Sequence, residues 1–332
     1  MREVQNETSP PKFSPSRSRR CRAAALPAVS RIARAQDYPS RPVRIIVNLA
    51  PGGGLDFNSR LIGEFVSRSL GQQVIVENKP GAGGMIGIEA AAKSAPDGYT
   101  ILTTTDVITS GPHVTATNTD FVKDLVPVIR LTGGPLVLAV HPSLGVNSIA
   151  ELVALSKQRS GLSYATFGAG TEQHFIGEWF AKLAMIKLEH VPYRGAGQAI
   201  NDLVAGHVGV GILGPVAVIP HAKAGALRIL AQSTGKRSPS LPDVPTFEEA
   251  GIKGLVLPAW QGAFVPRGTA PAIIARLNAE IGKALVDPTV RQRLFEAAQD
   301  PVGGTPEQLA SLVAEDFEKY GRLARELKIK SE

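Results

Sequence analysis

The sequence is poor in the residues that build disulfides and metal sites. Cys21 is the only cysteine among 332 residues, and it lies in a basic N-terminal stretch. A chain that loses this stretch has no thiol, which excludes a disulfide, a cysteine nucleophile and a zinc site with cysteine ligands. The six histidines lie far apart, with no HxH or HxxxH pair, so a metal site has little support. We therefore expect neither a metal nor a cofactor.

Long apolar runs and enzyme signatures are also missing. No run approaches the roughly 18 apolar residues of a membrane span, so the mature chain is expected to be soluble. There is no P-loop signature and no GxSxG nucleophile elbow. Two GxGxx stretches carry Ile86 and Gln173 where a dinucleotide-binding turn needs its third glycine. These absences predict that the chain is not an enzyme.

Positive charge is concentrated at the N-terminus. The formal net charge is +7, but residues 1–35 hold eight basic and two acidic residues, which leaves 28 basic and 27 acidic residues in the rest of the chain. A nearly neutral body gives no electrostatic case for binding a polyanion. We expect no nucleic-acid partner.

Residues 1–35 have the features of an export signal. The short apolar run Ala23–Val29 follows a basic stretch, and Ala33-Arg34-Ala35 then has the small-x-small pattern of a cleavage site. Ser18-Arg19-Arg20 is a weak twin-arginine feature. We predict a periplasmic protein whose mature chain begins at about Gln36. A disordered basic tail is the alternative.

A strand, a glycine turn and a helix come directly after the leader. Residues 43–49 form a nearly continuous apolar run, typical of a strand covered on both faces of a parallel sheet. Pro51 ends the run, Gly52–Gly54 allow a positive φ and a close approach to a ligand, and Asp56 can cap the next helix. A helix N-terminus of this kind attracts carboxylates. An ordinary tight turn is the alternative, and Asp56 is better explained as a cap than as a ligand contact.

Strands and helices alternate along the rest of the chain, which predicts an α/β fold. Strands at 73–78 and 99–104, with helices at 58–70 and 86–93, complete a βαβαβ unit. Right-handed crossovers would bring Thr104 and Thr105 near Gly52–Gly54. The later elements expected are strands at 136–140, 162–166, 190–193, 208–213 and 227–231, and helices at 148–158, 198–205, 271–285, 288–298 and 306–327.

A second glycine turn leads into a helix after the strand at 162–166. It comprises Thr166, Phe167, Gly168, Ala169, Gly170 and Thr171, with His174 one turn into the helix. Two turns that can bind anions, in two α/β units, predict a ligand held between domains. His174 is expected to be a packing or hydrogen-bonding residue rather than a base.

Seven separate stretches carry a family resemblance. They are residues 38–44 (YPSRPVR), 51–56 (PGGGLD), 76–84 (VENKPGAGG), 96–100 (PDGYT), 168–171 (GAGT), 190–195 (HVPYRG) and 241–246 (LPDVPT). Each is weak alone. Together they resemble the Bug-type extracytoplasmic solute receptors, the periplasmic binding proteins of tripartite tricarboxylate transporters, across residues 38–330.

The resemblance implies a two-domain periplasmic-binding-protein fold of the Venus flytrap, type II-like kind, with a hinge and a ligand cleft between the domains. Residues 36–136 and 258–332 are expected to form domain 1, and residues 137–257 domain 2. The ligand contacts that it implies, mainly through backbone N–H groups and water, are Pro51, Gly52, Gly53, Gly54, Asp56, Thr104, Thr105, Thr166, Phe167, Gly168, Ala169, Gly170 and Thr171. His174, one turn into the helix that follows, is a further candidate contact.

The expected function is therefore a monomeric receptor that binds a small organic carboxylate for membrane transporter subunits. The sequence departs from the family pattern at Met85, where Asn is usual, and at Gly209 and Gly214, where acidic residues are common. Fewer acids weigh against an amino-acid ligand, whereas Phe167 in place of a small residue would allow an aromatic acid to stack. Two alternatives remain: a ligand sensor for a membrane sensor kinase, and an enzyme acting on a small acid with His174 as its only candidate base.

Overall fold

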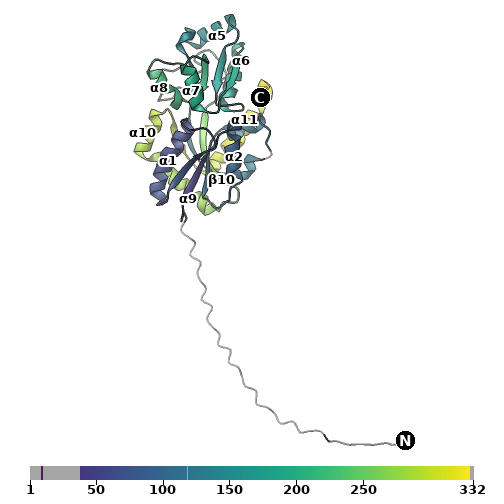
Figure 1. Ribbon diagram of the computed structural model, residues 1–332, viewed down its shortest axis with the longest axis vertical. Coiled ribbons are helices and arrows are strands. Elements are labelled where there is room, and N and C mark those ends of the chain that lie inside the picture. Colours follow the sequence, from purple (N-terminus) through teal and green to yellow (C-terminus); the bar gives the residue numbers. More distant parts are fainter. Residues whose placement is uncertain (1–8, 10–37, 118, 330–332) are drawn as a thin grey trace, which may run out of the picture. The chain divides into compact units, whose positions relative to one another are not determined.

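The computed structural model describes residue 9, residues 38–117 and residues 119–329. A compact unit begins at Tyr38 (Figure 1). The apolar run, the cleavage pattern and the arginine pair of the leader lie outside the described residues. Export, and maturation near Gln36, therefore stay predictions.

Two sheets organise the unit, in agreement with the predicted α/β fold. The order in the six-stranded sheet is β11 (Asp300–Gly303), β4 (Leu125–Gly134), β10 (Ala259–Pro266), β3 (Thr100–Thr105), β1 (Val43–Val47) and β2 (Val74–Asn78). The order in the five-stranded sheet is β7 (Glu189–Pro192), β6 (Ser163–Thr166), β8 (Val210–Leu213), β5 (Val137–Val140) and β9 (Arg228–Gln232). We call the six-stranded sheet with its helices lobe 1, and the five-stranded sheet with its helices lobe 2.

Helices cover both sheets (Figure 1). Lobe 1 carries α1 (Gly54–Leu70), α2 (Met85–Ala92), α3 (Val107–Ser110), α4 (Phe121–Asp124), α9 (Pro271–Val286) and α10 (Pro288–Glu296). Lobe 2 carries α5 (Ile149–Gln158), α6 (Glu172–Ala184), α7 (Ala196–Val204) and α8 (Pro215–Lys223). Three short 3-10 turns are η1 (Ala82–Gly84), η2 (Gly111–His113) and η3 (Pro142–Leu144).

Strand β1 shows why its sequence is apolar except at Arg44. Val43, Ile45 and Val47 belong to the core beneath α1, whereas Ile46 belongs to the core beneath α2. Both faces of the strand are thus buried, as the continuous run predicted. The parallel pairing of β1 with β2 and β3 confirms the βαβαβ unit.

Lobe 2 is not a simple second copy of that unit. The strand expected at 136–140 is present as β5, but it runs antiparallel to both β8 and β9. Strand β6 pairs in parallel with β7 and β8. The short segment 135–136 connects β4 directly to β5. Strand β5 therefore runs in the direction opposite to its two neighbours in the sheet, β8 and β9.

Two central strands of lobe 1 were not predicted. Strand β10 is absent from the predicted strands, yet it lies between β3 and β4 and is antiparallel to both. Its side chains Trp260 and Phe264 are buried. Strand β4 carries Pro127, and its pairing with β10 shifts register twice, so its sequence lacks the regular alternation of a strand.

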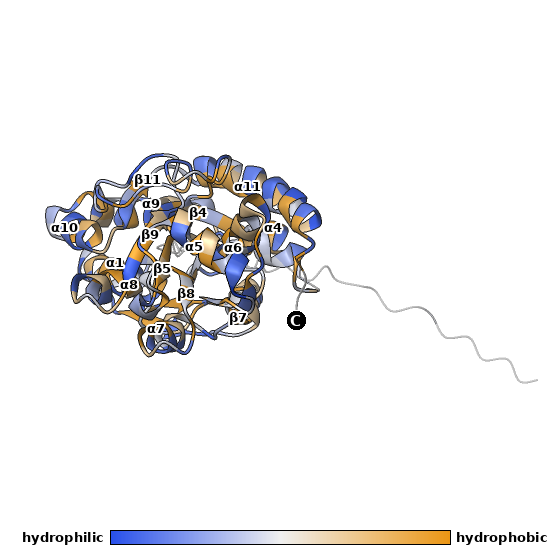
Figure 2. Cartoon of the chain, turned by 90° about the horizontal axis from the view of Figure 1, so that it is seen from above, coloured by the Kyte–Doolittle hydropathy of each residue, from blue (hydrophilic) through white to orange (hydrophobic). Residues whose placement is uncertain are grey.

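The C-terminal helix α11 (Pro306–Leu327) belongs to both lobes, and its bounds match the prediction. Leu309 and Val313, near its start, lie in the core with Trp260 and Phe264 of lobe 1. Tyr320 and Leu323, near its end, lie in the core of lobe 2. Figure 2 shows hydrophobic and hydrophilic bands along this helix. One amphipathic helix therefore contributes to two cores.

The chain crosses between the sheets at residues 135–136 and 233–258. The predicted domain boundaries, after residues 136 and 257, fall at these crossings and stay predictions. Across residues 38–117 and 119–329, no helix is long and apolar enough to span a bilayer.

Candidate functional site

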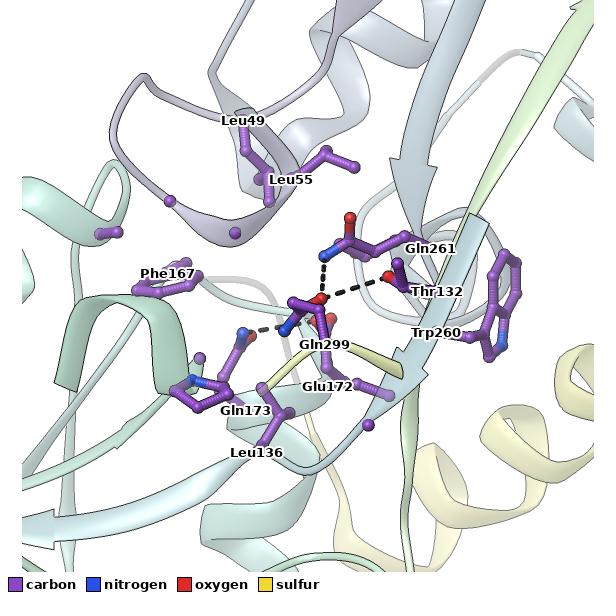
Figure 3. A pocket seen from close by; sticks show the side chains of 18 of the residues that line it. Leu49, Leu55, Thr132, Leu136, Phe167, Glu172, Gln173, Trp260, Gln261 and Gln299 are labelled. Carbon is purple, nitrogen blue, oxygen red and sulfur yellow. Dashed lines mark hydrogen bonds between the residues drawn. The ribbon is translucent and has the colours of Figure 1, made fainter. Parts of the chain in front are cut away.

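A pocket lies between the two lobes, with about 620 Å³ of space when its open mouth is counted (Figure 3). Lobe 1 contributes Leu49, Ala50, Gly53, Gly54, Leu55, Asp56, Thr105, Thr132, Gly133, Gly134, Trp260, Gln261 and Gln299. Lobe 2 and the crossings contribute Pro135, Leu136, Phe167, Glu172, Gln173, Gly195, Ala196, Gly214 and Pro215, and Ala259 at the start of β10 is a further lobe 1 residue. The walls are mostly apolar, with a few polar groups, as in sites for small molecules.

Four helices begin at this pocket. The first residues of α1, α6, α7 and α8, namely Gly54, Glu172, Ala196 and Pro215, all line it. None of the four preceding residues caps its helix with a side-chain hydrogen bond. Each N-terminus carries roughly half a positive charge, and its first turn has N–H groups without an intrahelical acceptor. Two of the first residues are exceptions: Pro215 has no N–H, and the N–H of Glu172 is accepted by its own carboxylate. The pocket can therefore hold an anion, although no Lys, Arg or His is among its lining residues in the described chain.

The first glycine turn differs in detail from the prediction. Helix α1 begins at Gly54, so Asp56 lies within its first turn and is not the cap. Asp56 instead accepts the N–H of Gly52 at 3.1 Å and pairs with Arg60. Although burial opposes ionisation, the Arg60 and Gly52 hydrogen bonds lower the pKa of Asp56. Of the three glycines, only Gly52 has a positive φ, +87°.

The pocket collects some of the predicted ligand contacts and leaves others outside. Gly53, Gly54, Asp56, Thr105 and Phe167 line it. Pro51 and Gly52 are exposed beside the turn, and Thr104 is buried within β3. Thr166, Gly168, Ala169, Gly170, Thr171 and His174 do not line this pocket. The ligand-binding role of every residue in the predicted set stays a prediction.

The second glycine turn contacts lobe 1 directly. A Cβ built on Gly83 would lie 2.6 Å from the carbonyl oxygen of Ala169, so these backbones approach closely. Ser110 donates a 2.7 Å hydrogen bond to the carbonyl of Gly170. A second surface hollow, with about 860 Å³ of space when its open mouth is counted, lies beside this contact. It is lined by Gly81–Gly84, by residues of the 192–194 segment, and by Phe167, Gly168 and Ala169 of the predicted ligand contacts. The turn thus forms part of the interface between the lobes.

His174 is a buried packing residue in this structure. Its ring stacks on His190 with centroids 3.8 Å apart, and its Nδ1 accepts the N–H of Gly170 at 3.3 Å. Burial lowers the pKa of His174 to about 4. Burial and the neighbouring His174 lower the pKa of His190 to about 3. The ring supports the second turn, and it does not line the pocket.

A buried pair of acids joins the lobes beside the pocket. Asp106, after β3, and Glu172, at the start of α6, are both buried. Burial, followed by the charge of Glu172, raises the pKa of Asp106 well above its usual range. Tyr320 donates a 2.6 Å hydrogen bond to Asp106 Oδ2. Asp106 Oδ1 and Glu172 Oε2 have no hydrogen-bond partner among the described residues, and the charge of each carboxyl opposes ionisation of the other.

Sequence reasoning missed these acids and a cluster of four neutral side chains. Asn58, Thr132, Gln261 and Gln299 come from α1, β4, β10 and the connection before β11, and hydrogen bonds join them. No motif connects positions so far apart in the chain. Glu172 could have been found, because it is the first helical residue after the second turn.

Comparison with known proteins identifies the family. The model of the tripartite tricarboxylate transporter family receptor matches residues 59–329. Protein BugT of Bordetella pertussis is 36% identical over 299 residues, 88% of this chain and 91% of BugT. A protein from the tcbD-tcbE intergenic region of Pseudomonas sp. strain P51 is 36% identical over 303 residues, 90% of each chain.

Solved structures agree with the observed fold. An R. palustris protein solved with adipate is 31% identical with a TM-score of 0.86, covering 89% of this chain and 100% of its own. MatC from Rhodopseudomonas palustris, with bound malate, is 30% identical with a TM-score of 0.82, covering 86% and 99%. A structure described as a periplasmic transporter is 34% identical with a TM-score of 0.85, covering 88% and 99%. This chain therefore belongs to the tripartite tricarboxylate transporter receptor family, the Bug-type solute receptors, and has their two-domain periplasmic-binding-protein fold.

Proposed function

We propose that this protein is an extracytoplasmic receptor that binds a small organic carboxylate between its lobes and delivers it to a tripartite tricarboxylate-type transporter. The observation that carries the proposal is the convergence of four uncapped helix N-termini on one pocket. Such a site binds an anion through backbone N–H groups. The adipate and malate of the two R. palustris structures support a carboxylate as that anion.

The same pocket gives little support to catalysis. Its lining residues in the described chain include no Ser, Cys, Lys or His that could act as a nucleophile or base. Asp56 is already paired with Arg60, and Glu172 is buried against Asp106. We infer binding without turnover, in a periplasmic protein exported by the leader.

A thermal-shift screen of organic acids tests the receptor function. A ligand at a hundredfold excess over its Kd is expected to add about 2.7 kcal/mol to the free energy of unfolding. Each acid that shifts the melt should then be recovered unchanged after incubation with the protein. A broad panel without any shift would remove the receptor proposal, and chemical conversion of a bound acid would favour the enzyme.

A further inference from the structure

The four neutral side chains form a polar wall beside the first turn of α1. Asn58, Thr132, Gln261 and Gln299 are each at most 8% exposed. Asn58 Nδ2 donates to the amide oxygens of Gln261 at 2.8 Å and Gln299 at 3.1 Å. Thr132 Oγ1 and Gln261 Nε2 also donate to Gln299 Oε1, at 3.2 and 3.1 Å. Both glutamine oxygens are therefore occupied.

The side-chain nitrogens of Gln261 and Gln299 retain N–H groups that can donate to a ligand. Gln261 Nε2 uses one N–H for Gln299 and keeps the other. Gln299 Nε2 makes only a long contact, 3.4 Å, with the carbonyl of Ala298. A Cβ built on Gly54 would lie 3.6 Å from Gln261 Nε2 and 3.8 Å from Gln299 Nε2. The two donors thus stand next to the helix start that binds the anion.

Gln173 supplies the complementary group. It lines the same pocket, is 2% exposed, and its Oε1 has no hydrogen-bond partner among the described residues. Its Nε2 makes a long contact, 3.4 Å, with Glu172 Oε1. Figure 3 shows Gln173, Gln261 and Gln299 extending into the pocket. A buried amide oxygen without a donor costs free energy until a ligand supplies one.

A ligand group that satisfies this arrangement must both accept and donate. A hydroxyl accepts from a glutamine N–H and donates to Gln173 Oε1. An ionised second carboxylate only accepts, would leave Gln173 Oε1 unpaired, and would meet no cationic side chain on the described lining. A methylene group neither accepts nor donates a hydrogen bond. The hydroxyl must lie close to the carboxylate on the carbon chain, because the donors stand beside Gly54.

We propose that the pocket selects carboxylates that carry a hydroxyl near the carboxyl group, with Gln173, Gln261 and Gln299 as the residues that recognise the hydroxyl. The proposal rests on the receptor function proposed above. It narrows the ligand class to hydroxy acids, in place of the plain or aromatic acids that the sequence left open.

Calorimetry on the full chain with matched pairs of acids tests this specificity. The pairs are 2-hydroxybutyrate with butyrate and malate with succinate, which differ by one hydroxyl. The hydroxylated member of at least one pair is expected to bind about tenfold more tightly, the value of one or two neutral hydrogen bonds. Equal binding within both pairs would overturn the proposal.

Two variants locate the recognition. Gln173→Leu removes the unpaired oxygen and no other short contact, so it should abolish the preference for the hydroxylated acid. Gln299→Leu removes the donor together with the acceptor of Asn58, Thr132 and Gln261, so only the ratio of affinities within each pair of acids is compared, and that ratio should fall to about one. Gln292→Leu makes the same change on the exposed face of α10 and should keep the preference. If Gln299→Leu does not fold, the measurement on Gln173→Leu alone tests the proposal. A folded Gln173→Leu protein that keeps the full preference would contradict the proposal.

The two proposals fail in different ways. If acids bind but hydroxylated and deoxy members are equal, the receptor function stands and the hydroxyl specificity falls. If no acid in the panel binds, both fall together.

Discussion

At the scale of single residues, Gly54 controls how closely α1 approaches lobe 2. A Cβ on Gly54 would lie 3.2 Å from Val216 Cγ2, whereas a Cβ on Gly53 would lie 3.4 Å from Ala196 Cβ, an ordinary contact. The sequence suggested that these glycines provide a positive φ, but at Gly54 the restriction is the limited space beside the helix start. A side chain should therefore be tolerated less well at Gly54 than at Gly53.

We expect Gly54→Val to weaken carboxylate binding at least about tenfold, because the branched side chain separates α1 from α8 and removes one charge-assisted backbone bond. Gly53→Ala is the matched control and should bind within about threefold of the unmodified protein. Calorimetry measures both affinities, and circular dichroism checks folding. Normal binding by a folded Gly54→Val protein would mean that α1 is not part of the site.

The buried His174 makes stability depend on pH. Its pKa is about 4 in the folded protein, against 6.5 for a free histidine. Between these values the unfolded chain takes up a proton that the folded protein does not. The contribution of neutral His174 to the free energy of unfolding is complete above pH 6.5. It is lost as the pH falls toward 4, by up to roughly 3 kcal/mol.

We expect His174→Gln to flatten the decline in the free energy of unfolding between pH 6.5 and 4. Urea titrations across this range measure the slope, with the exposed His207→Gln as the matched control. The same decline in both variants would show that His174 does not cause it.

The pocket residues predicted from the sequence lie on the glycine turns or, for Thr105, at the end of β3 in the βαβαβ unit. Gly53, Gly54 and Phe167 belong to glycine turns that follow strands, so local reasoning found them. Gln261 and Gln299 belong to segments far apart in the chain, and only the sheet order brings them together. Neutral amides also carry no charge pattern that would single them out.

At the scale of elements, the sequence predicts the helices and strands that have clear capping or turn residues at their ends and a regular apolar spacing. Helix α11 matched its predicted bounds because Thr305 caps it, with Pro306 at its first position, and its apolar face is regular. Helix α8 was missed because Pro215 and Pro220 read as breakers, although the first occupies a helix start. Strand β10 was missed because Gly262 and the terminal Pro266 indicate a loop.

Tyr320 tests how strongly α11 holds the lobes together. It packs edge-to-face on Phe175 and donates to Asp106. We expect Tyr320→Ala to cost about 3–5 kcal/mol, through the cavity and the lost bond, and Tyr320→Phe only about 1 kcal/mol. Urea unfolding measures both. Equal costs would show that the hydroxyl, rather than the ring, carries the contribution.

At the scale of the whole molecule, the chain crosses between the sheets at 135–136 and 233–258, and α11 packs in the cores of both lobes. Resemblance across many short motifs predicted this two-domain fold, while composition and periodicity alone reached only its α/β class. The antiparallel strands β5 and β10 follow from where the chain crosses between sheets, which no local pattern records.

We expect a bound carboxylate to favour the arrangement in which the lobes meet, because its contacts come from both. X-ray scattering should show a smaller radius of gyration when a binding acid is saturating. Gly54→Val, at the same acid concentration, should remain extended. An unchanged radius in the unmodified protein, with calorimetry confirming saturation, would exclude a hinge motion of measurable size.

The position of α11 also determines the order in which the protein can be assembled. A chain made from its N-terminus presents every strand of both sheets except β11 before residue 300. At that point the core of lobe 2 still lacks Tyr320, Leu323 and Ala324, which are among the last residues to be synthesised. A growing chain therefore stays incomplete in both cores until its final thirty or so residues are made.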